Sequence, residues 1–430
     1  MNDMTHGRSL PQPDPAARPR PLRAGLFGAL DIGSNKVCCL IGRADGDGML
    51  RVLGVGHTQS RGVRAGGITD LEEVEACIRT AVGAAEKMAD HRLRSVTVNL
   101  TCGQPESRLF NLQWPVGGRA VTGADLRRVV QEGRSRALCD GRDTIHILPL
   151  TFAVDGTSGV ADPRGLHCET LSARLHVLDA GATALLNLQL TLERCELGLT
   201  ELVSAPFASG LSTLVEDERQ LGATVIDMGG GTTSMGVFSE GQLLHTAQLP
   251  IGGGHVTNDV ARLLSTPVAD AERLKTVYGN ADSSPDDERE ILSVPMVGEE
   301  EEHLQKIPRS RLVGIIKPRL EETFELVRDR LEGTGLMREA GTRLVLTGGA
   351  SQLVGAREMA SRILDRQVRL GRPTPLRGLP DRASGPAFAT VAGLLAWATG
   401  AGRRIADIDT IDDRPDTALR RFVNFLRDRV

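Results

Sequence analysis

The chain has 430 residues with 51 Lys and Arg against 55 Asp and Glu, a net charge of −4 and a pI near 6.2. This balance argues against bulk electrostatic binding to nucleic acid, and an aromatic content of 3% argues against base stacking. The length exceeds what one hydrophobic core holds, so at least two lobes are expected. Residues 1–24 are rich in Pro and Arg and predict a disordered tail rather than a signal peptide.

Strands are predicted at 26–31, 37–42, 50–56 and 95–100. Between the last two, Thr69 and Glu72 form a predicted capping box for a helix. The apolar face of that helix comprises Leu71, Val74, Ile78, Val82, Ala85 and Met88. Strands alternating with long helices are typical of an α/β lobe.

Residues 105–178 read as a small α+β module inserted into this lobe, with a helix at 122–137 and strands at 144–154 and 171–177. A helix at 181–195, a strand at 200–204 and a helix at 206–215 follow. The seven cysteines show no CxxC pair and no zinc-ligand spacing, which predicts reduced thiols.

A second lobe is predicted from strands at 223–228, 233–238 and 243–249 and helices at 255–264 and 268–278. Residues 280–307 are polar and are interpreted as a solvated loop with its flanks. A helix at 309–331 contains Pro318, for which a kink is expected. The small apolar helix at 386–399 is expected to pack deep between the lobes.

Three strand–glycine turns carry the chemistry, at Asp31-Ile32-Gly33-Ser34-Asn35-Lys36, at Asp227-Met228-Gly229-Gly230-Gly231-Thr232 and at Thr347-Gly348-Gly349-Ala350-Ser351. A turn of this kind points backbone N–H groups at an anion, and hydroxyl residues add donors. One such turn alone is more often a structural β-turn. The first two, nearly two hundred residues apart, suggest a duplicated lobe that clamps a polyphosphate, and no P-loop sequence competes with them.

These turns, with Gly66-Gly67-Ile68-Thr69-Asp70-Leu71-Glu72 and Glu216-Asp217-Glu218-Arg219, resemble the actin-like ATPase superfamily and, within it, the FtsA cell-division family. The resemblance covers residues 25–430 and implies an α/β, actin-like two-lobed ATP-binding fold with an inserted α+β subdomain and a C-terminal amphipathic helix. The implied organisation is a tail at 1–24, a first lobe core at 25–104 and 179–221, an inserted subdomain at 105–178, a second lobe core at 222–254 and 335–386, its outer subdomain at 255–334, a helix returning to the first lobe at 387–400, a flexible linker at 401–416 and a membrane-targeting helix at 417–430.

The resemblance also implies site roles. Asp31 and Asp227 would hold Mg²⁺ through water, with a purely structural role as the alternative. Lys36 would add a positive charge beside the phosphates of ATP, and Glu272 and Lys275 would flank adenine and ribose unless they simply form an exposed helix face. The full implied nucleotide set is Gly33, Ser34, Asn35, Lys36, Gly229, Gly230, Gly231, Thr232, Gly253, Gly254, Thr257, Glu272, Lys275, Gly348, Gly349, Ala350 and Ser351.

The rate of ATP hydrolysis is expected to be low. Vigorous hydrolases of the superfamily place a polar residue where this chain has Ala205-Pro206-Phe207-Ala208-Ser209-Gly210. This stretch lacks a carboxylate or amide to orient water, so strong ATP binding with slow or negligible hydrolysis is predicted, and no catalytic residue is assigned.

The C-terminal segment is amphipathic at helical spacing. Its apolar stripe and flanking arginines predict a helix lying in a membrane interface near anionic lipid, the alternative being a helix docked on its own core or on a partner. The residues concerned are Leu419, Arg420, Arg421, Phe422, Val423, Phe425, Leu426 and Arg427.

The family resemblance implies a peripheral protein on the cytoplasmic face of the inner membrane at the division septum, which self-assembles into filaments and tethers the FtsZ ring. Arg319 and Glu322 are candidates for contacting the FtsZ C-terminal tail, although they also read as ordinary surface charges. Other division proteins are expected partners and nucleic acid is not. A small-molecule kinase and a pilus-assembly actin homologue remain the alternatives.

Overall fold

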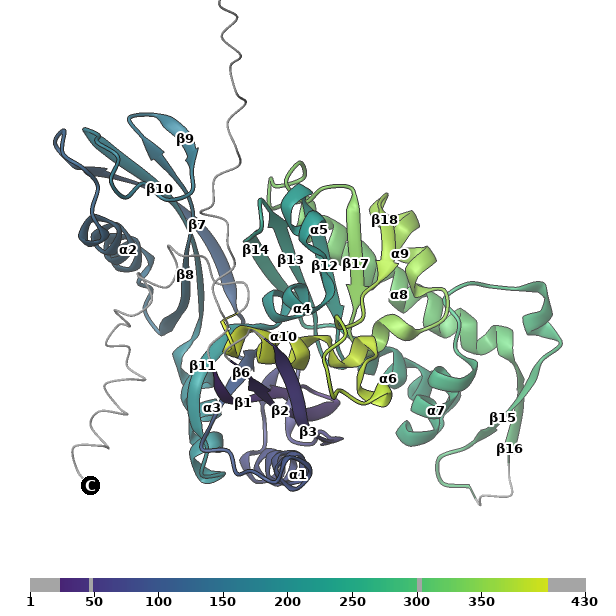
Figure 1. Cartoon of the computed structure of the whole chain (residues 1–430). Helices are drawn as coiled ribbons and strands as arrows, with labels where there is room; N and C mark the ends of the chain where they lie inside the picture. The colour runs from purple at the N-terminus through teal and green to yellow at the C-terminus, as the bar shows by residue number, and fades with distance from the viewer. Residues whose placement is uncertain (1–23, 46–48, 300–303, 401–430) are drawn as a thin grey trace, which may run out of the picture.

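The structure is a computed structural model that describes residues 24–45, 49–299 and 304–400, so the predicted linker and membrane-targeting helix lie outside the described residues. Two five-stranded sheets form the centres of two lobes, with a third sheet standing beside them (Figure 1). No helix within the described ranges is long and apolar enough to cross a membrane.

The two central sheets have the same strand order. The first runs β11-β6-β1-β2-β3, from Gly198–Ser204, Ser95–Leu100, Gly25–Ile32, Lys36–Ala44 and Leu50–Gln59. The second runs β18-β17-β12-β13-β14, from Gln367–Leu370, Arg343–Thr347, Ala223–Met228, Thr233–Ser239 and Gln242–Leu249. In both, three antiparallel strands continue into two parallel ones, which confirms the prediction of a duplicated lobe.

The helices and short strands of the first lobe surround its sheet. Helix α1 (Leu71–Ala89) packs on β3, and α3 (Ala182–Arg194) packs on α1. The remaining elements are the strands β4 (Val63–Arg64) and β5 (Gly67–Ile68). The N-cap of α1 is Asp70, which accepts from the N–H groups of Glu72 and Glu73, so the expected capping box from Thr69 is wrong by one residue. Met88 is exposed and does not belong to the apolar face.

The inserted module forms a four-stranded sheet in the order β7-β10-β8-β9, from Glu106–Pro115, Thr170–Gly181, Arg142–Val154 and Thr157–Val160. Helix α2 (Gly123–Ala137) covers it and encloses a core of its own that includes Leu126, Phe152 and Leu171. The sequence predicted α2, β8 and β10, but β7 and β9 were not predicted.

The second lobe carries α5 (Glu216–Leu221), α6 (Gly253–Leu264), α7 (Val268–Tyr278), α8 (Arg309–Glu332) and α9 (Ala356–Leu364). The interpretation of 280–307 as a solvated loop is wrong, because β15 (Ile291–Pro295) and β16 (Leu304–Pro308) pair as an antiparallel hairpin. Leu292, Val294 and Ile307 are buried against the second-lobe core, which gives this polar segment its strand register.

Two helices join the lobes. Helix α4 (Ala205–Thr213) packs against α10 (Ala389–Ala398), and α10 also lies on β1, β2 and β6 (Figure 1). One apolar cluster contains Leu40 of the first sheet, Val225 of the second and Leu394 of α10. The structure therefore confirms that the apolar helix near 386–399 packs between the lobes.

The close approach of α4 and α10 predicts a sensitive position. A Cβ at Gly393 would lie 1.7 Å from the backbone oxygen of Ala208, so Gly393→Ala should force the helices apart and destabilise the protein by about 1–3 kcal/mol. Thermal unfolding of the purified variant measures this. Gly314→Ala in α8 is the matched control, since nothing lies within 4 Å of its added methyl group, and it should be neutral or stabilising. Equal melting temperatures for the two variants would contradict the packing.

Candidate functional site

The first two glycine turns have the same hydrogen-bond geometry. The Gly33 N–H donates to the Lys36 oxygen at 3.0 Å, and the Gly229 N–H donates to the Thr232 oxygen at 2.9 Å. In each turn a Cβ on the first glycine would lie 3.0 Å from that same oxygen. Both positions therefore favour glycine for the same reason, which is a tight reversal between two antiparallel strands.

The two turns also face each other. A Cβ at Gly230 would lie 2.7 Å from the Asn35 Cβ, and one at Gly231 would lie 2.4 Å from the Ser34 Oγ. Within the described ranges, the N–H groups of Ser34, Asn35, Gly230 and Gly231 donate no hydrogen bond. The turns thus supply unpartnered donors. Because their tips touch, a ligand held by both must lie beside the tips or separate them.

Two aspartates lie at the base of these turns. Asp227 is buried, and its Oδ2 accepts from the Ser209 Oγ at 2.5 Å and from the Thr390 Oγ1 at 2.8 Å. Burial raises the pKa of Asp227 despite these two hydroxyl donors. Burial also raises the pKa of Asp31 to about 7, with Lys36 opposing the shift and the Asp227 charge adding to it. The two carboxylates therefore repel each other electrostatically in a poorly solvated region.

The ammonium group of Lys36 already has partners. It donates to the Ala387 oxygen and lies 3.6 Å from the centroid of the Phe388 ring. Lys36 therefore connects the first turn to the segment that begins α10. Sequence reasoning assigned its charge to this region but missed Ala387, Phe388, Ser209 and Thr390, all distant from it in the chain.

The carboxylates fit a hydrated magnesium ion. Mg²⁺ keeps several waters and needs one or two protein carboxylates, which Asp31 and Asp227 can provide. No group of three or more His, Cys, Asp or Glu residues suited to a metal occurs in the described part of the chain. An all-protein metal cage is thus absent from that part, and a cation shared with phosphate oxygens matches the donor set.

Helix α6 begins directly behind the second turn. The Gly253 N–H donates to the Gly229 oxygen at 2.9 Å, and the Gly254 N–H donates to the Gly230 oxygen at 2.7 Å. A Cβ at Gly253 would lie 2.9 Å from the Ala350 Cβ. The predicted residues of the second turn, α6 and the third turn are therefore brought together.

Lys275 joins this group from α7. Its Nζ donates to the Thr257 Oγ1 at 2.9 Å and to the Glu272 Oε2 at 2.6 Å, and it also reaches the Gly253 oxygen. The Lys275 side chain is only 15% exposed, whereas Glu272 is 43% exposed. Lys275 is thus not part of an exposed helix face, and the pair lies at the start of α6.

The third glycine turn lies against Asp227. Gly348 has φ of +87°, and a Cβ there would lie 2.4 Å from the Asp227 Oδ1. The buried Ser351 donates its hydroxyl to the Gly348 oxygen at 2.7 Å, while Gly349 lies near the Ala387 Cβ. All three turns therefore converge around Asp227.

The remaining predicted residues lie elsewhere. On α8, the Arg319 Nε donates to the Asp259 Oδ2 at 2.5 Å, and its guanidinium also pairs with Glu322. Arg319 is about 29% exposed, so this ion-pair group reaches the surface of the outer subdomain. The predicted membrane residues 417–430 lie outside the described residues.

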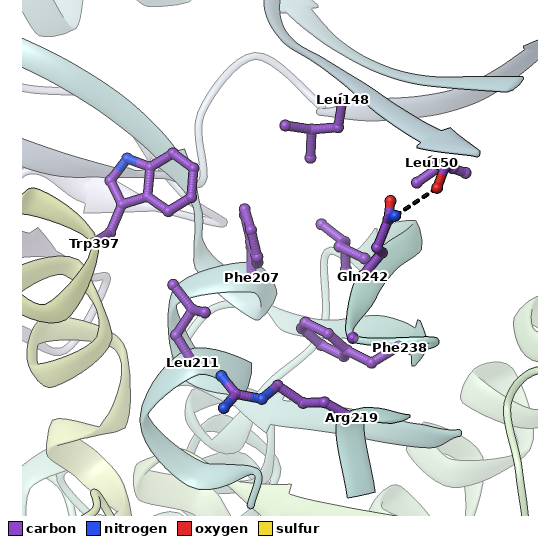
Figure 2. Close-up of a pocket in the computed structure, with 10 residues that line it drawn as sticks. Leu148, Leu150, Phe207, Leu211, Arg219, Phe238, Gln242 and Trp397 are labelled. Atoms are coloured by element: carbon purple, nitrogen blue, oxygen red, sulfur yellow. Dashed lines mark hydrogen bonds between the residues drawn. The ribbon is translucent and has the colours of Figure 1, made fainter. Parts of the chain in front are cut away.

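A separate apolar pocket lies where the inserted subdomain meets the second lobe and α10 (Figure 2). Leu148, Phe207, Phe238 and Trp397 line it, and Gln242 closes one side by donating to the Leu150 oxygen. Its cavity volume is about 30 Å³, close to the volume of one water molecule. It is too small for a nucleotide.

The Asp31 environment predicts a pH-dependent stability. Because folding raises its pKa from 3.8 to about 7, the unfolded chain loses this proton first and stability falls as pH rises through that window. Asp31→Asn should therefore gain stability relative to the unsubstituted protein above about pH 7, by up to about 4 kcal/mol. Melting temperatures across the window, without nucleotide or divalent cation, measure it. Exposed Asp217→Asn is the control, and an Asp31→Asn difference that does not change with pH would refute the assignment.

Known protein families match two parts of the chain. The model of the family described as "Cell division protein FtsA" matches residues 224–393, and the model of the "SHS2 domain inserted in FTSA" matches residues 103–178. The chain is 43% identical over 408 residues to the cell division protein FtsA of Rhizobium meliloti (strain 1021), covering 92% of this chain and 91% of that protein. It is 35% identical over 379 residues to that of Escherichia coli (strain K12), covering 86% and 90%.

Solved structures show the same fold at low sequence identity. The PilM-PilN type IV pilus biogenesis complex aligns with a TM-score of 0.62 at 17% identity, over 87% of this chain and 98% of that chain. MreB5 of Spiroplasma citri bound to ADP aligns with a TM-score of 0.53 at 12% identity, over 91% and 99%. These likenesses establish the actin-like fold alone. The sequence identity along nearly the whole chain establishes more, namely that it belongs to the FtsA family of actin-like cell-division proteins.

Proposed function

We propose that the three glycine turns bind ATP together with Mg²⁺. The observation that carries this proposal is the pair of touching turns with unpartnered N–H groups beside two carboxylates, of which Asp227 is buried and Asp31 is partly buried. A polyphosphate would accept those hydrogen bonds, and a divalent cation would supply the positive charge that Asp31 and Asp227 lack. Lys36 adds a single positive charge to the two negative ones.

Each group of residues then has a distinct task. Gly33 to Lys36 and Gly229 to Thr232 hold the phosphates, while Asp31 and Asp227 orient the waters of the cation. Glu272 and Lys275, held by Thr257 at the start of α6, contact the nucleoside side, and Gly348 to Ser351 lie under it. The cation, when bound, neutralises charge on the phosphates.

ATP acts mainly as a structural ligand in this proposal. The α4 segment offers Ser209 to Asp227, and its other residues from Ala205 to Gly210 carry no carboxylate or amide. A water beside the terminal phosphate would find no general base on this segment. Binding energy would instead favour the closed, assembly-competent form and self-association.

Gly231 provides the test of the nucleotide site. Gly231→Ala places a Cβ 2.4 Å from the Ser34 Oγ and should separate the turns, weakening ATP binding at least about tenfold by calorimetry with Mg²⁺ present. Gly314→Ala, far from any neighbour, should bind as the unsubstituted protein does. If the unsubstituted protein takes up neither ATP nor ADP, the site is wrongly assigned. Turnover well above ~1 s⁻¹ would contradict the structural role.

We further propose that the chain tethers FtsZ to the cytoplasmic face of the membrane at the septum. Residues 417–430 would lie in the interface with Phe422 and Leu426 among acyl chains and Arg420 near anionic headgroups. The FtsZ tail would dock on the outer subdomain near Arg319 and Glu322, whose ion-pair group reaches the surface. Membership of a cell-division family over nearly the whole chain supports this role.

Removing the predicted helix separates the two halves of this role. The chain ending at 416 should lose most binding to anionic vesicles while still binding an FtsZ tail peptide, because the proposed docking surface lies on α8 in the second lobe and needs none of the removed residues. Vesicle co-sedimentation and peptide titration by fluorescence anisotropy measure the two. Retained vesicle binding would refute the membrane helix, and loss of peptide binding in the truncated chain would refute independent docking.

A further inference from the structure

Three arginine side chains stand in a row at one end of the first sheet. Arg43 of β2 lies opposite Arg51 of β3, and Arg51 forms a parallel bridge with Arg377 from the segment after β18. Residues directly opposed in a ladder project from the same face of the sheet. All three are exposed, and Arg43 also contacts His91, just beyond α1, through its Nη2 at 2.9 Å from the Nε2. We call these three residues the arginine row.

The arginine row has no anionic partner in the part of the chain that the structure describes. No carboxylate there lies within ion-pair distance of Arg43, Arg51 or Arg377, although exposed Asp45 follows closely on β2. Like charges directly opposite each other across strands are unfavourable. The row therefore has a standing electrostatic cost that an external anionic surface would relieve.

The row lies at the end of the lobe where the described chain leaves α10. Helix α10 follows Phe388, which contacts Lys36 at the glycine turns. Seven residues later, Leu395 packs beside Gly42, where a Cβ would lie 2.8 Å from the Leu395 Cδ2. Because Gly42 precedes Arg43, α10 runs from the turns toward the arginine row. Residues 401–430 therefore follow from the end of the lobe that carries the row.

We propose that the arginine row is a second membrane contact, which binds anionic phospholipid headgroups. This inference rests on the proposed membrane attachment through residues 417–430. The intervening residues 401–416 span at most about 58 Å when extended, so a terminal helix alone leaves the folded body many orientations. The arginine row selects the orientation in which this end of the first lobe faces the lipid.

The test compares two variants with equal loss of charge. Arg43→Gln/Arg51→Gln/Arg377→Gln removes the row, and Arg273→Gln/Arg311→Gln/Arg338→Gln removes three exposed arginines of the second lobe. The full-length proteins are co-sedimented with phosphatidylcholine vesicles containing about one-quarter phosphatidylglycerol, and with pure phosphatidylcholine vesicles. Melting temperature and ATP binding by calorimetry verify that both variants are folded.

The row variant should bind the anionic vesicles at least about tenfold more weakly than the unsubstituted protein, with a shallower dependence on salt. It should bind neutral vesicles unchanged, and the second-lobe variant should match the unsubstituted protein on both. Equal loss in the two variants, or no loss in either, overturns the inference. The chain ending at 416 is run in parallel. If the truncated chain binds as tightly as the full chain, the proposed membrane attachment through residues 417–430 is wrong. If the truncated chain loses most binding and the row variant loses none, the proposed lipid contact of the arginine row is wrong and the terminal helix stands.

Discussion

The site depends on two carboxylates that the fold holds near each other with too little positive charge. Asp31 and Asp227 are each the last residue but one of a central strand, and burial raises the pKa of both. Their surroundings are built around this charge, because Gly348 adopts φ of +87° where a Cβ would strike the Asp227 Oδ1. Ser209 and Thr390 donate hydroxyls to the same carboxylate from helices of different sequence regions. Charge left unbalanced in an otherwise consistent fold marks a place built for a ligand.

Much of this arrangement was predictable because its signals are local. A buried strand, an aspartate and a glycine turn occur within nine residues in each lobe, so the repeated pattern predicted both turns and the duplication. The strands at 95–100 and 223–228 were predicted with their observed bounds, since each is a continuous β-forming run. The helix near 386–399 was predicted to be buried because it carries no charged residue.

The remainder depended on contacts between distant residues. Thr390 lies 163 positions from Asp227, and Lys36 lies 351 positions from Ala387, so no spacing in the sequence joins either pair. The hairpin of β15 and β16 was missed because the acidic residues at 286–288 and 299–302 outweigh the few alternating positions, such as Leu292 and Val294, that the second-lobe core buries. The arginine row likewise exists only through pairing of β2, β3 and the segment at Arg377.

Helix α10 physically connects the proposed nucleotide site with the end of the first lobe that carries the arginine row. Its first turn carries Thr390, which donates to Asp227, and Lys36 donates to Ala387 just before it. Near its other end, Leu395 packs on Gly42 beside the arginine row. Its small residues, such as Gly393, allow it to pack closely against α4. Since α10 is buried along most of its length, it forms a continuous packed element between Asp227 and the end of the lobe from which residues 401–430 follow.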